Sequence, residues 1–301
     1  MLTDAVDSYL AIRRAAGFRL KLQGLLLKSF AAFSEARGCH HISSVIAIEW
    51  AGSAPSALQR ARRLGIIIRL ARYLRAEDQH HDVPPPVFGA ERYLRPTPYI
   101  LSAEQIRQLI AVVRQPGITL QPAAYSTLFC LLACTGLRVS EATRLRFEDI
   151  TADGLVIRNT KFRKSRLVPL HETARAGLER YFQQQRPYAP VADHVFVSLR
   201  RKPLRPQDVD TVFRAAVKRI GLPPARGRVR PTPHSLRHTF TVRALETCPD
   251  GRDAITKHML ALSTYLGHSK VAHTYWYLEA VPELMRDIAE RTERFAMEGQ
   301  S

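Results

Sequence analysis

The chain has 301 residues, enough for two domains, because single hydrophobic cores seldom grow beyond about 250 to 300 residues. Hydrophobic residues make up 46% and charged residues 24%, which excludes a disordered or collagen-like protein. The 45 Lys and Arg outnumber the 27 Asp and Glu, and the net charge of +18 indicates a polyanionic partner, with nucleic acid as the leading candidate.

Residues 1–80 are predicted to form a helical domain. Apolar residues recur there at intervals of three and four, and small or capping residues separate the repeats. Four helices fit this pattern. The first begins near Thr3, the second ends before Gly38, and the others follow Ser43 and Pro55.

Residues 81–98 are predicted to form an extended linker. This stretch holds five prolines, and proline fixes φ and disfavours helix in the preceding residue. The domain boundary is therefore expected here, between two basic halves of the chain.

Residues 99–301 combine helices with a short β region. A capping pattern at Ser102 and Gln105 predicts a helix, a second helix is predicted from Pro122, and helices resume after Pro206. Between them, three segments have the composition of strands: 153–159, 165–170 and 194–198. The predicted fold class is mainly α with a small antiparallel β-sheet (α+β).

The cysteines and the amino end indicate a cytoplasmic protein. No secretory segment or disulfide framework is evident, and no apolar run is long enough for a membrane span. Cys130 and Cys134 are interpreted as core residues, because no second cysteine pair accompanies them. Four histidines in or beside the first domain are expected at the surface: His40, His41, His80 and His81.

Four motifs occur in a fixed order in the second half. They are TGLRVSEATRL (135–145), NTKFRKSRLVPL (159–170), HSLRHTF (234–240) and YLGHS (265–269), and Tyr277 follows nine residues after His268. Each motif alone is weak, but their ordered combination over residues 99–280 resembles the catalytic domain of the tyrosine recombinase (phage integrase) family.

The resemblance implies a two-domain DNA recombinase. Residues 1–80 would be the helical core-binding domain, and residues 99–301 the catalytic domain with a C-terminal helix that docks on a neighbouring protomer. The implied partners are double-stranded DNA with specific recombination sites and further copies of the chain, as a tetramer on DNA in the bacterial nucleoid; the need for accessory proteins stays open. The implied catalytic residues are Arg138, Lys161, His234, Arg237, His268 and Tyr277.

These residue types suit cleavage of a phosphodiester. The guanidinium forks of Arg138 and Arg237 can each bind two phosphate oxygens and stabilise negative charge in the transition state. A tyrosine with a pKa near 10 needs help to lose its proton, which a neighbouring histidine can give, and Lys161 is the expected general acid for the leaving hydroxyl. The expected chemistry forms a 3′-phosphotyrosyl intermediate and uses neither a metal ion nor a cofactor.

Several neighbouring residues compete for these roles. Lys164 is the main rival of Lys161, and Arg163, Lys164 and Arg166 are interpreted as phosphate-backbone contacts. The other competitors are expected to be structural. His238 should pack within its helix, Tyr275 should point away from Tyr277 and pack, and Glu141 should orient nearby cations.

Two other functions stay open at the level of sequence. One is a topoisomerase that uses the same residues on a single duplex, and the other is a non-catalytic, sequence-specific DNA-binding protein. The segment CPDGRD (248–253) lengthens the interval between His234 and His268 and hints at a transposon-associated subgroup acting in integration or transposition.

Overall fold

The computed structural model describes residues 1–89, 97–158, 165–185, 193–222, 224, 230–248, 252–268 and 271–280. The chain divides into two compact units, Met1–Arg95 and Pro96–Ser301, each with its own hydrophobic core. Within the described ranges, no helix has both the length and the apolar character required to cross a bilayer.

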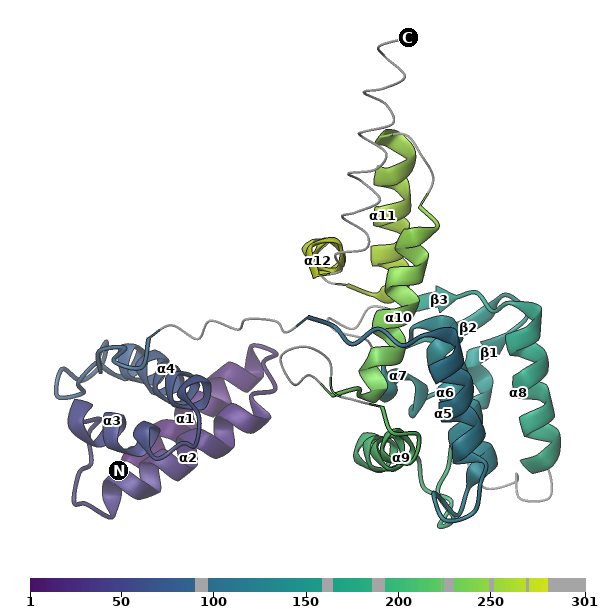
Figure 1. The fold of residues 1–301 in the computed structure, drawn as a ribbon. Helices are drawn as coiled ribbons and strands as arrows, with labels where there is room; N and C mark the ends of the chain where they lie inside the picture. The colour runs from purple at the N-terminus through teal and green to yellow at the C-terminus, as the bar shows by residue number, and fades with distance from the viewer. Residues whose placement is uncertain are drawn as a thin grey trace, which may run out of the picture. The chain divides into compact units, whose positions relative to one another are not determined.

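The first unit is a small helical bundle (Figure 1). Its helices are α1 (Leu2–Ala15), α2 (Lys21–Glu35), α3 (Ser44–Gly52) and α4 (Ala57–Leu74). Helix α1 packs against α2 and α4, and α3 packs against α4. The rings of Phe30 and Trp50 meet edge-on at 5.6 Å between centroids in the middle of this core. The helices predicted from periodicity are confirmed.

Of the predicted linker at 81–98, residues 90–96 lie outside the described residues. Its first part, 81–89, differs from an extended spacer. Val83 and Phe88 pack against the helical core, and Pro84 is buried. His81 is also buried, so its expected surface position is wrong, whereas His40, His41 and His80 are exposed as predicted. The apolar side chains of this segment pack on the helices of the first unit, to which the segment belongs.

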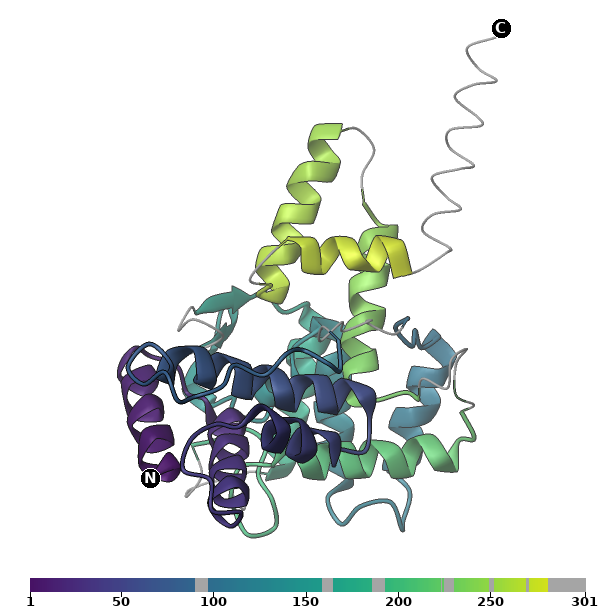
Figure 2. The same ribbon diagram turned by 90° about the vertical axis from the view of Figure 1, so that its left-hand side faces the viewer.

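The second unit is built around α6. Its helices are α5 (Ala103–Val113), α6 (Pro122–Thr135), α7 (Val139–Ala142), α8 (Glu172–Gln185), α9 (Pro206–Arg219), α10 (Pro233–Glu246), α11 (Arg252–Leu266) and α12 (Ala272–Ala280). Helices α5, α8 and α10 all pack against α6, and the rings of Phe129 and Phe213 meet edge-on in the core. Helix α12 crosses α10 and α11 and contacts both (Figure 2).

Local sequence signals explain where several of these helices begin. The predicted capping box is confirmed: Ser102 Oγ accepts from the Gln105 N–H at 3.1 Å, and Gln105 Oε1 accepts from the Ser102 N–H at 2.9 Å. Proline occupies the first turn of α6, α9 and α10, where its missing N–H is not needed.

The sheet of the second unit is an antiparallel meander in the order β1, β2, β3. Its strands are β1 (Ile150–Thr151), β2 (Gly154–Ile157) and β3 (Arg166–Val168), with Leu155 opposite Val168 and Ile157 opposite Arg166. The predicted class, mainly α with a small antiparallel sheet, is confirmed, and β2 and β3 fall inside the predicted strand segments.

The predicted strand at 194–198 is wrong. This segment makes two isolated β-bridges to different parts of the chain, His194 to Arg146 and Val197 to Pro203, instead of pairing along its length with one strand. Val195 and Phe196 are buried, so the apolar pattern reports a loop that packs into the core rather than a sheet strand.

Gly136 ends α6 and turns the chain toward α7. It adopts a left-handed conformation, with φ of 61°, and a Cβ atom at this position would approach Phe240 Cδ1 to 2.5 Å. The close contact between this turn and α10 therefore requires glycine on two separate grounds.

We predict that Gly136→Ala lowers the free energy of unfolding by about 2 to 4 kcal/mol, because left-handed strain and overpacking add. Gly221→Ala is the matched control, since Gly221 has a φ of 67° and open space around it, and should cost only about 1 kcal/mol. Urea denaturation measures both values; equal losses would contradict the close packing at Gly136.

Candidate active site

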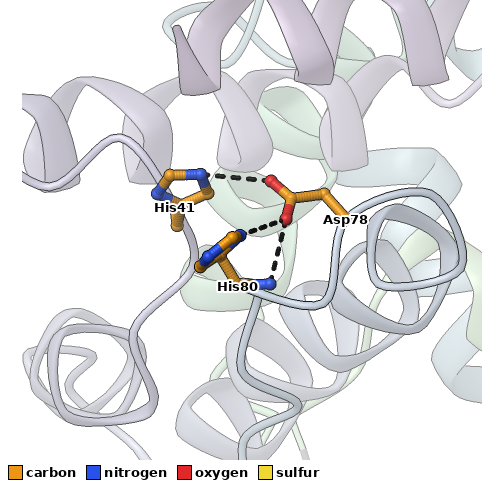
Figure 3. A group of neighbouring side chains, drawn as sticks. All are labelled: His41, Asp78 and His80. Atoms are coloured by element: carbon orange, nitrogen blue, oxygen red, sulfur yellow. Dashed lines mark hydrogen bonds and ion pairs between the residues drawn. The ribbon is translucent and has the colours of Figure 1, made fainter.

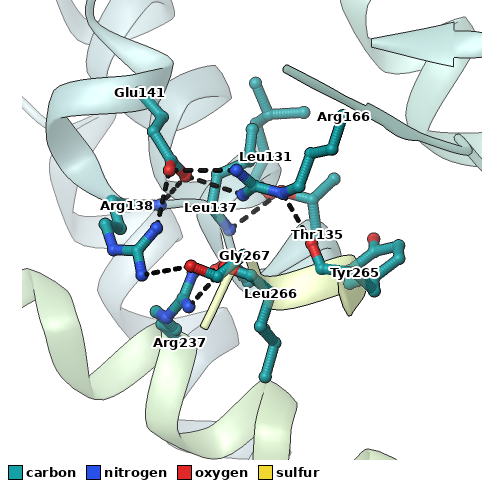
Figure 4. Close-up of polar contacts among 11 residues, drawn as sticks. Leu131, Thr135, Leu137, Arg138, Glu141, Arg166, Arg237, Tyr265, Leu266 and Gly267 are labelled. Carbon is teal, nitrogen blue, oxygen red and sulfur yellow. Dashed lines mark hydrogen bonds and ion pairs between the residues drawn. The ribbon is translucent and has the colours of Figure 1, made fainter. Parts of the chain in front are cut away.

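Three arginines from separate elements meet at the C-terminal end of α11 (Figure 4). One follows α6, one lies on β3 and one lies on α10, and each donates to a different carbonyl of residues 265–267. The bonds are Arg166 Nε to Tyr265 O at 2.7 Å, Arg237 Nη2 to Leu266 O at 2.7 Å, and Arg138 Nη2 to Gly267 O at 3.1 Å.

The end of a helix is a suitable anchor for cations. The last carbonyls of α11 lack partners within the helix and carry the negative end of its dipole. Gly267 ends the helix with φ of 66°, and a Cβ atom there would lie 2.9 Å from Arg166 Nη1. Glycine at this position therefore lets the helix stop and lets the guanidinium of Arg166 approach it.

Glu141 joins two of the three arginines. Its Oε1 accepts from Arg138 Nη1 at 2.8 Å, and both carboxylate oxygens accept from Arg166, at 3.1 and 2.9 Å. The predicted orienting role of Glu141 fits these contacts. The interpretation of Arg166 as a phosphate-backbone contact is wrong, because all three nitrogens of its guanidinium donate within the protein, Nε to Tyr265 O and Nη1 and Nη2 to Glu141.

The charges around Glu141 keep it ionised. Burial on its own would raise the pKa of Glu141, but the hydrogen bonds and positive charges of Arg166 and Arg138 outweigh burial and lower it to about 2. The ionised carboxylate therefore stabilises the fold at neutral pH, and this contribution is lost only as the pH falls from about 4.5 toward 2.

Arg237 and Arg138 differ in exposure. Arg237 is 2% exposed and is held from the other side by Gly136 O, which accepts from its Nη1 at 2.7 Å. Burial, reinforced by the charge of Arg138, lowers the pKa of Arg237 to about 10, so it stays charged at neutral pH. The side chain of Arg138 remains 32% exposed, which leaves it accessible to an anion from solution.

Tyr277 lies on α12 with its hydroxyl directed at α10. Its oxygen is 2.8 Å from His238 Nδ1, and the ring of His234 contacts His238 at 4.5 Å between centroids. The Tyr277 ring is 3% exposed and packs in the apolar cluster formed by α10, α11 and α12. Tyr275 is 49% exposed, so its expected packing is wrong.

His238 and its neighbour His234 are both neutral at neutral pH. Burial, together with the nearby charges of His234, Arg237 and His268, lowers the pKa of His238 to about 3. Burial, then the charges of Arg237 and Arg138, lowers the pKa of His234 to about 4, even though part of its side chain remains exposed. A neutral imidazole can accept a hydrogen bond from the phenol, so His238 is placed to hold and polarise the Tyr277 hydroxyl.

His268 connects the arginine cluster to the tyrosine helix. It directly follows Gly267, and its Nδ1 lies 2.8 Å from Thr274 Oγ1 in α12. The same short turn thus links the carbonyls that hold the arginines to the helix that bears Tyr277.

The structure thus brings together five of the six predicted catalytic residues: Arg138, His234, Arg237, His268 and Tyr277. Lys161 and its rival Lys164 fall in 159–164, outside the described residues, as does the expected terminal helix in 281–301. Sequence reasoning did not assign His238 or Arg166 to the site. His238 follows His234 by four residues on one face of α10, so the sequence brings the two histidines together but does not reveal the contact with Tyr277.

Known proteins with similar sequences support a single family. The model of the phage integrase family matches residues 100–283. A putative integrase/recombinase of Sinorhizobium fredii, y4rB, is 37% identical over 97% of this chain and 96% of its own length. Tyrosine recombinase XerD of Corynebacterium glutamicum is 31% identical over 71% of this chain and 66% of its own length.

Solved structures share the fold at lower identity. The Tn1549 transposon integrase, solved in complex with transposon right end DNA, superposes with a TM-score of 0.66 at 18% identity, covering 96% of this chain and 98% of that one. The lambda integrase tetramer bound to a Holliday junction gives a TM-score of 0.63 at 17% identity, covering 89% and 77%. The chain therefore belongs to the phage integrase family of tyrosine recombinases, the enzymes that cleave and religate DNA strands.

Proposed function

We propose that the protein is a site-specific DNA recombinase in which Tyr277 is the nucleophile and Arg138 and Arg237 bind the scissile phosphate. The observation that carries this assignment is the anchoring of the two guanidiniums on the adjacent carbonyls of Leu266 and Gly267, in the unit that also holds the Tyr277 and His238 pair. Two fixed positive charges beside a polarised phenol are what attack on a phosphodiester requires.

The proposed reaction is a transesterification. Tyr277 Oη forms a bond to the phosphorus, and the bond from phosphorus to the 5′ oxygen of the next deoxyribose breaks. The product is a 3′-phosphotyrosyl enzyme and a free 5′ hydroxyl. Because the new ester has a free energy similar to that of the old one, a second 5′ hydroxyl can attack it and reseal the strand.

Each proton in this reaction has an assigned partner. His238 holds the Tyr277 hydroxyl only in the resting state, at 2.8 Å. As Tyr277 attacks, His268, which already contacts α12 through Thr274, accepts the phenolic proton. Lys161 supplies the proton that the leaving 5′ oxygen takes up. His234 assists with hydrogen bonds, and Arg166 with Glu141 acts on Arg138 by fixing its position.

The resting position of Tyr277 has a consequence for the reaction. A ring that is 3% exposed cannot reach a phosphate in solution, so we infer that α12 moves away from α10 when DNA is bound. The hydroxyl would exchange its contact with His238 for the phosphate, and the arginines would stay in place because α11 holds them.

The known complexes support the proposed partners. The Tn1549 integrase binds transposon end DNA, and lambda integrase forms a tetramer on a Holliday junction. We propose by analogy that this chain binds double-stranded recombination sites with both predicted domains, residues 1–80 and 99–301, and exchanges strands as a tetramer in integration or transposition. The net charge of +18 is consistent with such a partner.

The first prediction from the proposed reaction concerns the nucleophile. Tyr277→Phe should abolish the covalent protein–DNA adduct on a nicked suicide substrate and leave duplex binding within about twofold, because only the reacting oxygen is removed. Tyr275→Phe is the matched control and should retain the adduct, since Tyr275 points to solvent. Denaturing gel electrophoresis measures the adduct; loss in Tyr275→Phe but not Tyr277→Phe would reverse the assignment.

The same substrates separate the alternative functions. Strand exchange between two duplexes identifies a recombinase, whereas relaxation of supercoiled DNA without exchange identifies a topoisomerase. Duplex binding without any adduct in the unaltered protein would indicate a non-catalytic DNA-binding protein.

A second prediction tests the role of Glu141. Glu141→Gln leaves two guanidiniums without a counter-charge, so the free energy of unfolding should fall by about 3 kcal/mol and cleavage should slow at least tenfold. Glu148→Gln is the control: Glu148 is 57% exposed and pairs only at 3.7 and 3.8 Å, so its loss should cost less than about 0.5 kcal/mol. Similar effects of the two substitutions would contradict the positioning role.

A third prediction concerns pH. The folded protein disfavours protonation of His238, whose pKa falls from 6.5 to about 3, so stability should decrease as the pH drops below 6.5. His238→Asn removes this titration but keeps an acceptor near Tyr277. Between pH 7 and pH 5 the variant should lose roughly 2 kcal/mol less than the unaltered protein. Denaturant titrations at both pH values measure this, and an unchanged loss would show that the fold does not lower the pKa of His238.

A further inference from the structure

A cluster of two histidines and an aspartate lies on the first unit, outside the catalytic unit (Figure 3). His41 precedes α3, and Asp78 and His80 follow α4. His41 Nε2 lies 3.1 Å from Asp78 Oδ2, and His80 Nδ1 lies 2.7 Å from Asp78 Oδ1. Neither the proposed reaction nor the core of the first unit uses these three side chains.

The donor atoms suit a transition-metal ion. Two imidazole nitrogens and a carboxylate oxygen are ligands that Zn²⁺ takes in proteins, at about 2.0 to 2.2 Å. Tetrahedral ligands at that range lie about 3.3 Å from one another. One ligand atom from each residue already lies within 4.8 Å of the other two. The rings of His41 and His80 are exposed and can rotate to close the remaining gap.

The backbone beneath the cluster is held in place. Asp82 N–H donates to Ile42 O at 2.8 Å, and Ile42 N–H donates to Nδ1 of the buried His81 at 3.0 Å. Asp82 Oδ2 in turn accepts from the Ser44 N–H at 3.0 Å. These bonds join the connection between α2 and α3 to the segment after α4. His41 therefore faces Asp78 and His80 before any ligand is present, which lowers the entropy cost of binding a metal ion.

His81 supports the cluster without being one of its donors. Because its Nδ1 accepts from Ile42, the proton of the neutral ring is on Nε2, which lies 3.9 Å from Asp78 Oδ2. Carboxylates that ligate metal ions are themselves commonly held by outer groups, and the buried His81 lies beside Asp78 as such a group.

We propose that His41, Asp78 and His80 bind one divalent transition-metal ion of the Zn²⁺ class. The ion connects the segment at 39–43 to the segment at 78–82 and stabilises the first unit at the point where the chain leaves it. Water completes the coordination. This site is separate from the proposed recombination chemistry, and its role is structural.

The rival explanation is a hydrogen-bonded cluster without a metal. In that arrangement, each histidine needs a proton on the nitrogen that faces Asp78, and a metal ion replaces those protons. The two explanations differ in a direct way: only the proposed site binds Zn²⁺ through all three side chains at once.

The test is isothermal titration calorimetry of the full-length chain with ZnCl₂, after EDTA has removed bound metal. We expect the chain to bind one equivalent of Zn²⁺ tightly. The affinity for this ion should fall at least tenfold in Asp78→Asn, His41→Ala and His80→Ala. His40→Ala is the matched control, because His40 is an exposed neighbour outside the cluster, and it should bind as the unaltered chain does. Saturating Zn²⁺ should also raise the melting temperature by several degrees in the unaltered chain and the control alone.

The contradicting outcomes are equally specific. The proposal is overturned if the unaltered chain shows no saturable binding of Zn²⁺. It is also overturned if Asp78→Asn and His80→Ala bind one Zn²⁺ as tightly as the unaltered chain, because other side chains then hold the ion. Circular dichroism in EDTA checks that each variant folds. If Asp78→Asn does not fold, His80→Ala decides, because the His80 side chain is 82% exposed and its removal leaves the core untouched.

Discussion

The catalytic unit depends on the way one helix ends. The carbonyls of Tyr265–Gly267 accept hydrogen bonds from Arg166, Arg237 and Arg138, which come from β3, α10 and the turn after α6. Three like charges so close together would repel one another, but the helix dipole and the Glu141 carboxylate offset that repulsion. The arrangement is electrostatic preorganisation: the cations are fixed before a phosphate arrives, so the reaction does not have to gather them.

The parts of this site that a sequence can predict are those with local signals. Helix capping, proline at helix starts and the ordered motifs identified the catalytic helices and the residues on them. Arg166 was misjudged because a basic protein has many solvated arginines, and only its tertiary contacts distinguish it. In β3, Arg166 shares a face with the buried Val168, whereas Leu167 is 45% exposed; because Leu167 and Val168 are both apolar, the sequence does not show which face is buried. An arginine on the buried face of a strand needs a partner, and Glu141 provides it.

The errors in the fold have a common physical origin. The apolar side chains at 194–198 and 81–89 do indicate burial. A loop that packs on a core buries them as well as a strand does, so the apolar pattern alone does not distinguish a packed loop from a strand, or a packed segment from an extended linker. Strand β1, with Ile150 and Thr151 alone, is too short to produce a periodic pattern at all. His238 was likewise assigned to packing, and it does pack, yet its Nδ1 faces the hydroxyl of Tyr277, which lies 39 residues away along the chain. Such long-range pairings cannot be derived from spacing on one helix.

The central claim is that Tyr277 of this chain becomes bonded to DNA. The most direct measurement is mass spectrometry of the protease-digested covalent complex, trapped on DNA from the genetic neighbourhood of the coding sequence. The account predicts a nucleotide attached through a 3′ phosphate to the peptide that contains Tyr277, with the modification on that residue and not on Tyr275. A covalent complex that carries the nucleotide on any other residue would contradict it.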